Sequence, residues 1–146
     1  MVRVLIVEDY LLWRLLVADM LAGSPEVQVA GQAENGLTGI QMAIELQPDV
    51  VILDVGLPDR NGIEVARQIL ELSPKTRILF LSQDTSKEVI CAALSTGAYG
   101  YVVKSKAHRD LLPALDAVLQ GKFFVGASVF ETRPGEQSSS PISCEC

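Results

Sequence analysis

Five polar side chains follow runs of apolar residues in a pattern that suggests shared chemistry. Glu8 and Asp9 come directly after one run, Asp54 follows a second, and Ser82 and Lys104 stand at the ends of two more. Short β-branched runs of this kind are typical of buried strands. Because the carboxyl ends of parallel strands meet at one edge of a sheet, we expect these side chains to converge there.

Three carboxylates gathered in one place require a cation, since two unit charges about 4 Å apart repel by several kcal/mol at a surface-like dielectric. Carboxylate oxygens suit a hard ion, and Mg²⁺ fits best because it keeps several waters and needs few protein ligands. A metal, a lysine and a hydroxyl around a carboxylate are what a transferring phosphoryl group requires. Asp54 would then be the nucleophile that forms an aspartyl-phosphate.

Each of these residues also has an ordinary structural interpretation. Glu8 and Asp9 could form a turn and helix cap, Ser82 could be a cap, and Lys104 could simply face solvent. What favours a functional site is that acids, hydroxyl and lysine fall at the same end of four strands. The sequence has no glycine-rich phosphate loop and no dinucleotide-binding motif, and it shows no Ser/His/Asp set around His108, its single histidine. Classical nucleotide binding and triad hydrolysis are therefore disfavoured.

The elements that must position these residues alternate along the chain. Apolar periodicity and Gly, Pro and Asn breaks predict strands at 2–7, 27–33, 50–54, 77–82 and 99–103, and helices at 9–22, 37–46, 62–72, 85–96 and 108–120. Strands that alternate with helices indicate an α/β fold, a doubly wound parallel sheet of five strands with five helices on its two faces.

Composition limits the remaining possibilities. A chain of 146 residues fits one domain, and its net charge of −6 argues against direct nucleic-acid binding. No apolar run reaches the roughly 18 residues of a membrane span, and the start has no secretory leader, so we expect a cytoplasmic protein with no membrane partner. The three cysteines lack disulfide-framework spacing, and the pair Cys144 and Cys146 alone would make a poor metal site.

The motifs together resemble the receiver domain of two-component response regulators, which has a flavodoxin-like (CheY-like) fold with strand order 2-1-3-4-5. The resemblance covers about residues 2–125 and is closest to the NarL/FixJ-type subgroup. Its carriers, in chain order, are Glu8-Asp9, Asp54, Leu57-Pro58, Asn61-Gly62, Ser82, and Gly97-Ala98 leading to Tyr101 and Lys104.

The resemblance implies a role for each matching residue. Asp54 would accept a phosphoryl group from a sensor histidine kinase or phosphotransfer protein. Mg²⁺ would be held by Asp9, Asp54 and the backbone carbonyl of Gly56, with Glu8 acting through water. Lys104 and Ser82 would bind the phosphoryl group, and Ser82 with Tyr101 would form the conformational switch. The only catalysis expected is of the domain's own phosphorylation and dephosphorylation.

The sequence also departs from the family pattern. Gln83 follows the switch hydroxyl where a small residue is usual, so it would narrow access to Asp54, and Ser105 replaces a proline that often follows the lysine. We expect a receiver domain at 1–125 and a flexible tail at 126–146 with no DNA-binding domain, which leaves open a stand-alone protein or a truncation.

Two other functions remain open at this point. One is a receiver-like interaction module that works without phosphorylation, which Gln83 would favour. The other is a phosphatase with an aspartyl nucleophile, which the absence of a second acid two residues after Asp54 disfavours.

The first helix carries two apolar stripes, and either could face solvent. One consists of Trp13, Val17 and Met20, and the other of Leu12, Leu15 and Leu16. An exposed Trp13 stripe would support a homodimer through this helix and the last one. The simpler interpretation is that a very apolar helix packs deeply.

Overall fold

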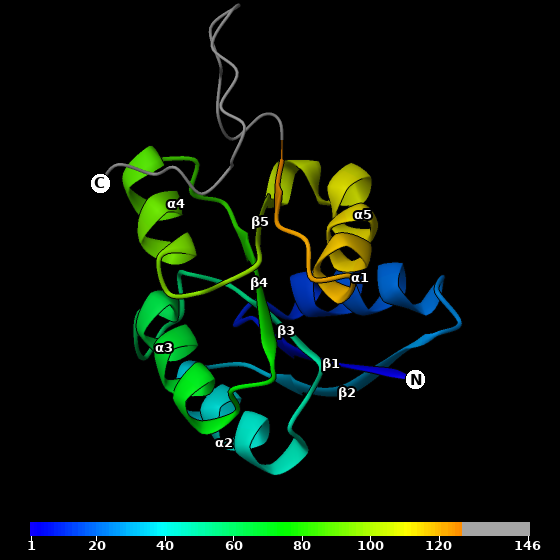
Figure 1. Ribbon diagram of the computed structural model, residues 1–146, viewed down its shortest axis with the longest axis horizontal. Coiled ribbons are helices and arrows are strands. Elements are labelled where there is room, and N and C mark those ends of the chain that lie inside the picture. The colour runs from blue at the N-terminus through cyan, green and yellow to red at the C-terminus, as the bar shows by residue number, and fades with distance from the viewer. Residues whose placement is uncertain (127–146) are drawn as a thin grey trace, which may run out of the picture.

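The computed structural model describes residues 1–126 and shows an α/β fold (Figure 1). The strands are β1 (Val2–Val7), β2 (Val27–Ala33), β3 (Val50–Leu53), β4 (Arg77–Ser82), β5 (Gly100–Val103) and β6 (Phe124–Val125). The helices are α1 (Leu11–Ala22), α2 (Gly36–Leu46), α3 (Gly62–Leu72), α4 (Lys87–Leu94) and α5 (Ala107–Leu119), with a 3-10 turn η1 (Lys104–Lys106) before α5. The predicted α/β class and five helices are confirmed. Residues 127–146, most of the predicted tail, lie outside the described part.

The sheet is parallel, with strand order β2-β1-β3-β4-β5-β6. The predicted order of the first five strands is confirmed, but the predicted number of strands is wrong because β6 pairs with β5. Phe123 stacks on Tyr99 with ring centroids 5.0 Å apart, and the amide of Phe124 donates to the carbonyl of Tyr99 at 2.9 Å. A strand of two residues is too short to produce a periodic pattern, so it is recognised only from these contacts with residues distant along the chain.

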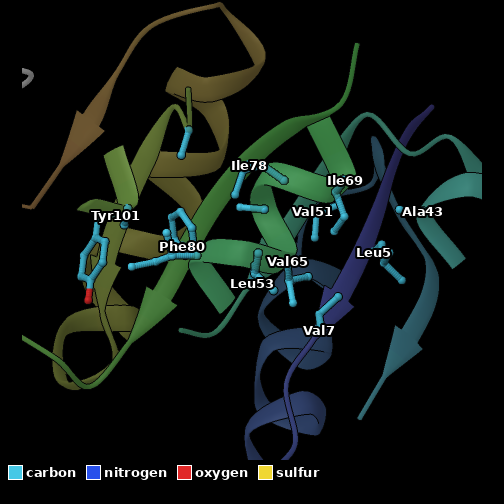
Figure 2. Packing of buried hydrophobic residues seen from close by; sticks show 14 of the residues in the cluster. Leu5, Val7, Ala43, Val51, Leu53, Val65, Ile69, Ile78, Phe80 and Tyr101 are labelled. Carbon is cyan, nitrogen blue, oxygen red and sulfur yellow. The ribbon is translucent and has the colours of Figure 1, made fainter. Parts of the chain in front are cut away.

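Helices cover both faces of the sheet (Figure 1). Helices α2, α3 and α4 bury Ile40, Ile69 and Ile90 against one face, in a core that also holds Phe80 and Tyr101 (Figure 2). Helices α1 and α5 bury apolar side chains against the other face. Because β3 and β4 lie between the two layers, their apolar runs are buried on both sides, which explains why they read as continuous rather than alternating.

Side-chain caps set several helix boundaries. Asn35 accepts from the amide of Thr38 at 2.8 Å, Asn61 from Ile63 at 2.7 Å, and Ser86 from Val89 at 3.3 Å. These bonds satisfy amides that the first helical turn leaves unpaired. With Ser86 as its cap, the fourth helix begins two residues later than predicted. The first helix, which has no side-chain cap, also begins two residues later than predicted, after Tyr10.

The leucine stripe of α1, not the Trp13 stripe, faces solvent. Leu12, Leu15 and Leu16 are all exposed, with Leu12 at 62%, and so is the neighbouring Leu11, whereas Val17 is fully buried. Trp13 and Met20 are partly buried and pack against the core between α1, α5 and the sheet. The expectation that one of the two stripes could face solvent is confirmed, for the leucines, whereas the simpler interpretation that the whole helix packs deeply is wrong. The exposed Trp13 stripe on which the expected homodimer depended is not observed. Within residues 1–126, none of the helices combines the length and apolar character needed to cross a membrane.

Candidate functional site

The polar residues at the strand ends line one pocket at the carboxyl edge of the sheet. The pocket has a volume of about 480 Å³. Its wall includes Glu8, Asp9, Asp54, Ser82 and Lys104, so the predicted convergence of these residues is observed. Because β1 and β3 are neighbours and β4 and β5 follow them, every one of these strands ends at the same place.

The three acids form a tight cluster. One carboxylate oxygen from each of Glu8, Asp9 and Asp54 lies within 4.8 Å of the others. The backbone holds two of them in register, since the amide of Glu8 donates to Ala33 and that of Asp54 donates to Val7, each at 3.0 Å. Glu8 and Asp54 are buried, whereas Asp9 is exposed at the mouth.

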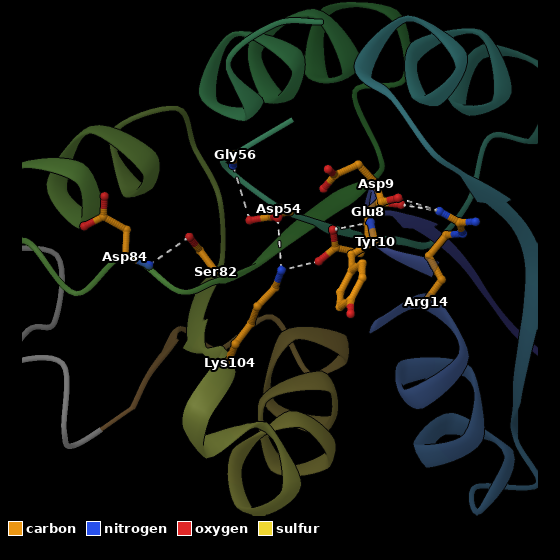
Figure 3. A network of polar contacts seen from close by, with 9 residues as sticks. All are labelled: Glu8, Asp9, Tyr10, Arg14, Asp54, Gly56, Ser82, Asp84 and Lys104. Atoms are coloured by element: carbon orange, nitrogen blue, oxygen red, sulfur yellow. Dashed lines mark hydrogen bonds and ion pairs between the residues drawn. The ribbon is translucent and has the colours of Figure 1, made fainter. Parts of the chain in front are cut away.

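Lys104 reaches into this cluster from the far side of the pocket (Figure 3). Its Nζ lies 3.1 Å from Oδ2 of Asp54 and forms an ion pair with Oε1 of Glu8. Burial raises the pKa of Glu8 above its ordinary value of 4.5, and the hydrogen bond from Lys104 opposes that rise. The lysine is itself only 6% exposed, so its charge is held where water screens it weakly.

The loop after β3 is held close to Asp54. The amide of Gly62 donates to the carbonyl of Val55 at 2.8 Å, and the amide of Gly56 donates to Oδ1 of Asp54 at 3.3 Å. A Cβ at Gly62 would lie 2.7 Å from the Cα of Val55 and closer still to the carbonyl oxygen of Asp54. Glycine at position 62 therefore permits the start of α3 to press directly against the backbone of the acid.

Ser82 lines the pocket, whereas Tyr101 lies outside its wall and is linked to it through Asp84. Oγ of Ser82 accepts from the amide of Asp84 at 3.1 Å, and the hydroxyl of Tyr101 donates to the carbonyl of Asp84 at 2.7 Å. Tyr101 is fully buried, and its ring centroid lies 6.1 Å from that of Phe80. Burial raises the pKa of the Tyr101 phenol to about 12. Gln83 is exposed and forms part of the pocket wall, where the sequence predicted it.

Three residues that sequence reasoning did not single out for the site support it. Arg14 donates to the carbonyl oxygens of Glu8 and Asp9, at 2.8 and 3.2 Å (Figure 3). Asp59, on the loop after β3, accepts from the amides of Gly36 and Leu37 at 2.7 and 2.9 Å.

Trp13, the third of these residues, lines the pocket with its ring 5.1 Å from Nζ of Lys104. The partners of Asp59 and Trp13 are distant along the chain, so no local pattern could have found them. Those of Arg14 are only five and six residues away, but the bonds are to backbone carbonyls, which no side-chain pattern reports.

The acid cluster fits a divalent cation. Its donors are all oxygens, two carboxylates end adjacent strands, and the pocket has room for the several waters that Mg²⁺ retains. Both oxygens of Glu8 already have protein partners, because Oε2 accepts from the amide of Tyr10 at 3.1 Å while Oε1 pairs with Lys104. Asp9 and Asp54 are therefore better placed to ligate an ion directly.

Fold and site together define a doubly wound α/β domain with an acid and lysine site at the carboxyl edge of its sheet. The family model of the response regulator receiver domain matches residues 4–116. The nitrate/nitrite response regulator protein NarL of Escherichia coli is 32% identical over 126 residues, which is 86% of this chain and 58% of NarL. The DNA-binding transcriptional activator DevR/DosR of Mycobacterium tuberculosis is 34% identical over 148 residues, covering 98% of this chain and 68% of that protein.

Solved structures agree with these relatives. A LuxR-family two-component response regulator from Aurantimonas superposes with a TM-score of 0.83 at 28% identity, covering 87% of this chain and 91% of that one. The isolated REC domain of RcsB from Salmonella enterica, in the presence of the phosphomimetic BeF3⁻, gives a TM-score of 0.83 at 27% identity over 88% and 95% of the two chains.

The chain belongs to the response regulator receiver family, and its relatives place it among the NarL-type receivers. The resemblance predicted from the sequence is confirmed. It is thus a receiver domain with a signalling role in two-component regulation. The chain spans little more than half the length of NarL, so the activity of that whole protein is not attributed to it.

Proposed function

We propose that this domain accepts a phosphoryl group on Asp54 from a sensor histidine kinase or phosphotransfer protein. The observation that carries the proposal is the buried carboxylate of Asp54 with Nζ of Lys104 at 3.1 Å and two further acids beside it. An oxygen of Asp54 bonds to phosphorus as the nitrogen–phosphorus bond of the donor breaks. The leaving imidazole keeps that electron pair and takes up a proton.

Each neighbouring residue has a part in this transfer. Mg²⁺, when bound, neutralises the negative charge of the phosphoryl oxygens. Asp9, Asp54 and the carbonyl of Gly56 would hold it, with Glu8 acting through water. Lys104 stabilises a phosphoryl oxygen with its ammonium group, and Arg14 fixes the backbone that carries Asp9.

The switch would run through Ser82 and Tyr101. Ser82 would rotate so that its hydroxyl donates a hydrogen bond to a phosphoryl oxygen, which would alter the bond that it now accepts from the amide of Asp84. Tyr101 is hydrogen-bonded to the carbonyl of that same Asp84. A movement of the Asp84 backbone would therefore change the hydrogen bond of the buried Tyr101 and, through it, the surface formed by α4, β5 and α5. In this way a new local charge would shift the balance between two conformations of the domain.

Phosphate uptake provides the direct test. The protein is incubated with Mg²⁺ and a small phosphodonor, and the intact mass is measured. We expect one added phosphate in the wild type and none in Asp54→Ala or in the presence of a chelator. Failure of every donor, including a histidine phosphotransfer protein, would refute the proposal.

A phosphorylation-independent interaction module is the second candidate, and the exposed Gln83 in the pocket wall favours it. A long side chain there would restrict the approach of a donor to Asp54. If Gln83 only restricts access in a working phosphoacceptor, Gln83→Ala should accelerate phosphate uptake several-fold. Unchanged binding of a partner by Asp54→Ala would be the signature of the second candidate.

A homodimer through the leucine stripe of α1 is part of the proposal. The three leucines of this stripe and the neighbouring Leu11 form an exposed apolar surface of the kind that association covers. The RcsB relative occurs as dimers on DNA. Sedimentation should show dimers of the wild type and monomers of Leu12→Glu, whereas a wild type that stays monomeric with and without phosphorylation would refute the dimer.

A further inference from the structure

Trp13 contacts both the hydrophobic core and the pocket around Asp54. It is the single tryptophan of the sequence and lies in the first turn of α1. One part of its side chain packs against the core shared with α5, and another lines the pocket. Nζ of Lys104 lies over the face of its ring, 5.1 Å from the centroid. A side chain required only for packing has no need of a cation over its ring.

The ammonium group of Lys104 must be held in a fixed position to bind a phosphoryl group, and Trp13 is placed to hold it. Lysine is a point charge on a flexible four-carbon stem, and ordering it costs conformational entropy. Its two ionic partners, Glu8 and Asp54, both attract the ammonium group toward the cluster of acids. A phosphoryl group on Asp54 would change the charges on that side of the lysine, whereas the ring of Trp13 is packed against the core on the other side.

We propose that Trp13 is a positioning residue for Lys104, with a cation–π contact that holds the ammonium group ready for a phosphoryl oxygen. This inference rests on the proposed phosphoryl acceptance by Asp54. The ring attracts the ammonium without neutralising it, unlike a third carboxylate, so the full positive charge remains available. Preorganisation of this kind strengthens binding mainly by removing the cost of ordering the group on arrival.

The first test does not depend on phosphorylation. A cation over an aromatic face experiences its ring current, so the side-chain NMR signals of Lys104 should be shifted upfield in the wild type. They should return to ordinary positions in Trp13→Leu and stay shifted in Trp13→Phe, which keeps an aromatic face. Ordinary Lys104 signals in the folded wild type would overturn the contact itself.

The second test is a double-mutant cycle read by the affinity for BeF3⁻ with Mg²⁺, a mimic of the phosphoryl group. Trp13→Leu should weaken that affinity about 3- to 30-fold, the range expected for a cation–π contact. In a Lys104→Met background the same change should have little effect, because the residue through which Trp13 acts is gone. Equal losses in both backgrounds would show that Trp13 acts only on packing and would overturn the proposal.

A matched control separates packing from positioning. Met20 lies on the same helix and against the same core but outside the pocket wall. Met20→Ala should lower the melting temperature without changing the affinity for BeF3⁻, and a loss of affinity equal to that of Trp13→Leu would overturn the proposal. A wild type that takes up neither phosphate nor BeF3⁻ would refute the proposed function instead, while the NMR comparison would still decide the contact between Trp13 and Lys104.

Discussion

Gly62→Ala should be among the most damaging single-atom additions in this domain. The added Cβ would lie 2.7 Å from the Cα of Val55 and closer still to the carbonyl oxygen of Asp54. Both neighbours are backbone atoms, which cannot rotate aside as a flexible side chain can. The substitution thus acts on the acid at the centre of the site without changing any polar group.

The expected cost follows from these distances. Carbon atoms pack at about 3.5–4.0 Å, so the loop after β3 or the start of α3 must retreat by roughly 1 Å. Overpacking of this kind typically costs about 1–3 kcal/mol. For a domain of this length, that corresponds to a fall in Tm of about 3 °C or more. The retreat would also displace Asp54 from Lys104, which lies 3.1 Å away, so phosphate uptake should slow.

Thermal denaturation of Gly62→Ala and Gly56→Ala provides the assay and its control. A Cβ at Gly56 would meet nothing within 4 Å, although this glycine lies in the same loop. Gly56→Ala should therefore be neutral or more stable by up to about 1 kcal/mol, because alanine restricts the unfolded chain. Equal Tm values for Gly62→Ala and the wild type would refute the steric reasoning.

Three other substitutions or titrations test separate parts of the site. The carboxylate of Asp59 accepts hydrogen bonds from two backbone amides, and these bonds lower its pKa below the ordinary value of 3.8. The ionised carboxylate therefore stabilises the fold at pH values above 3.8, and this stabilisation is lost as the pH falls through the lowered pKa. Asp59→Asn should consequently have a lower Tm than the wild type at neutral pH, and the difference should vanish in acid; a difference independent of pH would contradict this. In an absorbance titration, one tyrosine should ionise only near its pKa of about 12, and Tyr101→Phe should remove that step and cost about 1 kcal/mol because the carbonyl of Asp84 loses its donor. Mg²⁺ at 100 times its Kd should stabilise the fold by about 2.7 kcal/mol, and Asp9→Asn should abolish most of that gain in denaturation with and without chelator.

The sequence was most informative where strands end. A short apolar run such as Val50 to Leu53 suits a strand covered on both sides, and the acid behind such a strand then emerges at the carboxyl edge of the sheet. The same reasoning applied to β1, β4 and β5 brought Glu8, Ser82 and Lys104 to that edge. This part was predictable because it depends on local periodicity and on one general property of parallel sheets.

Exposure and element boundaries were less predictable. Both apolar stripes of α1 have helical spacing, so periodicity could not say which one the core would take. Similarly, β6 is only two residues long, and it pairs with β5 beside the stacked rings of Phe123 and Tyr99, which are distant along the chain. Such outcomes are decided by competition between surfaces that are distant along the chain.

The sequence by itself therefore determined the fold class, the family and the identity of the residues gathered at the site. Only the tertiary structure decided the partners of those residues. It paired Lys104 with Glu8 as well as Asp54, placed the ring of Trp13 over the lysine, and used Asp59 to bind the start of α2. The physical reason is that periodicity reports which side of an element is buried, whereas ion pairs and ring contacts depend on distances between atoms that the chain brings together only when it folds.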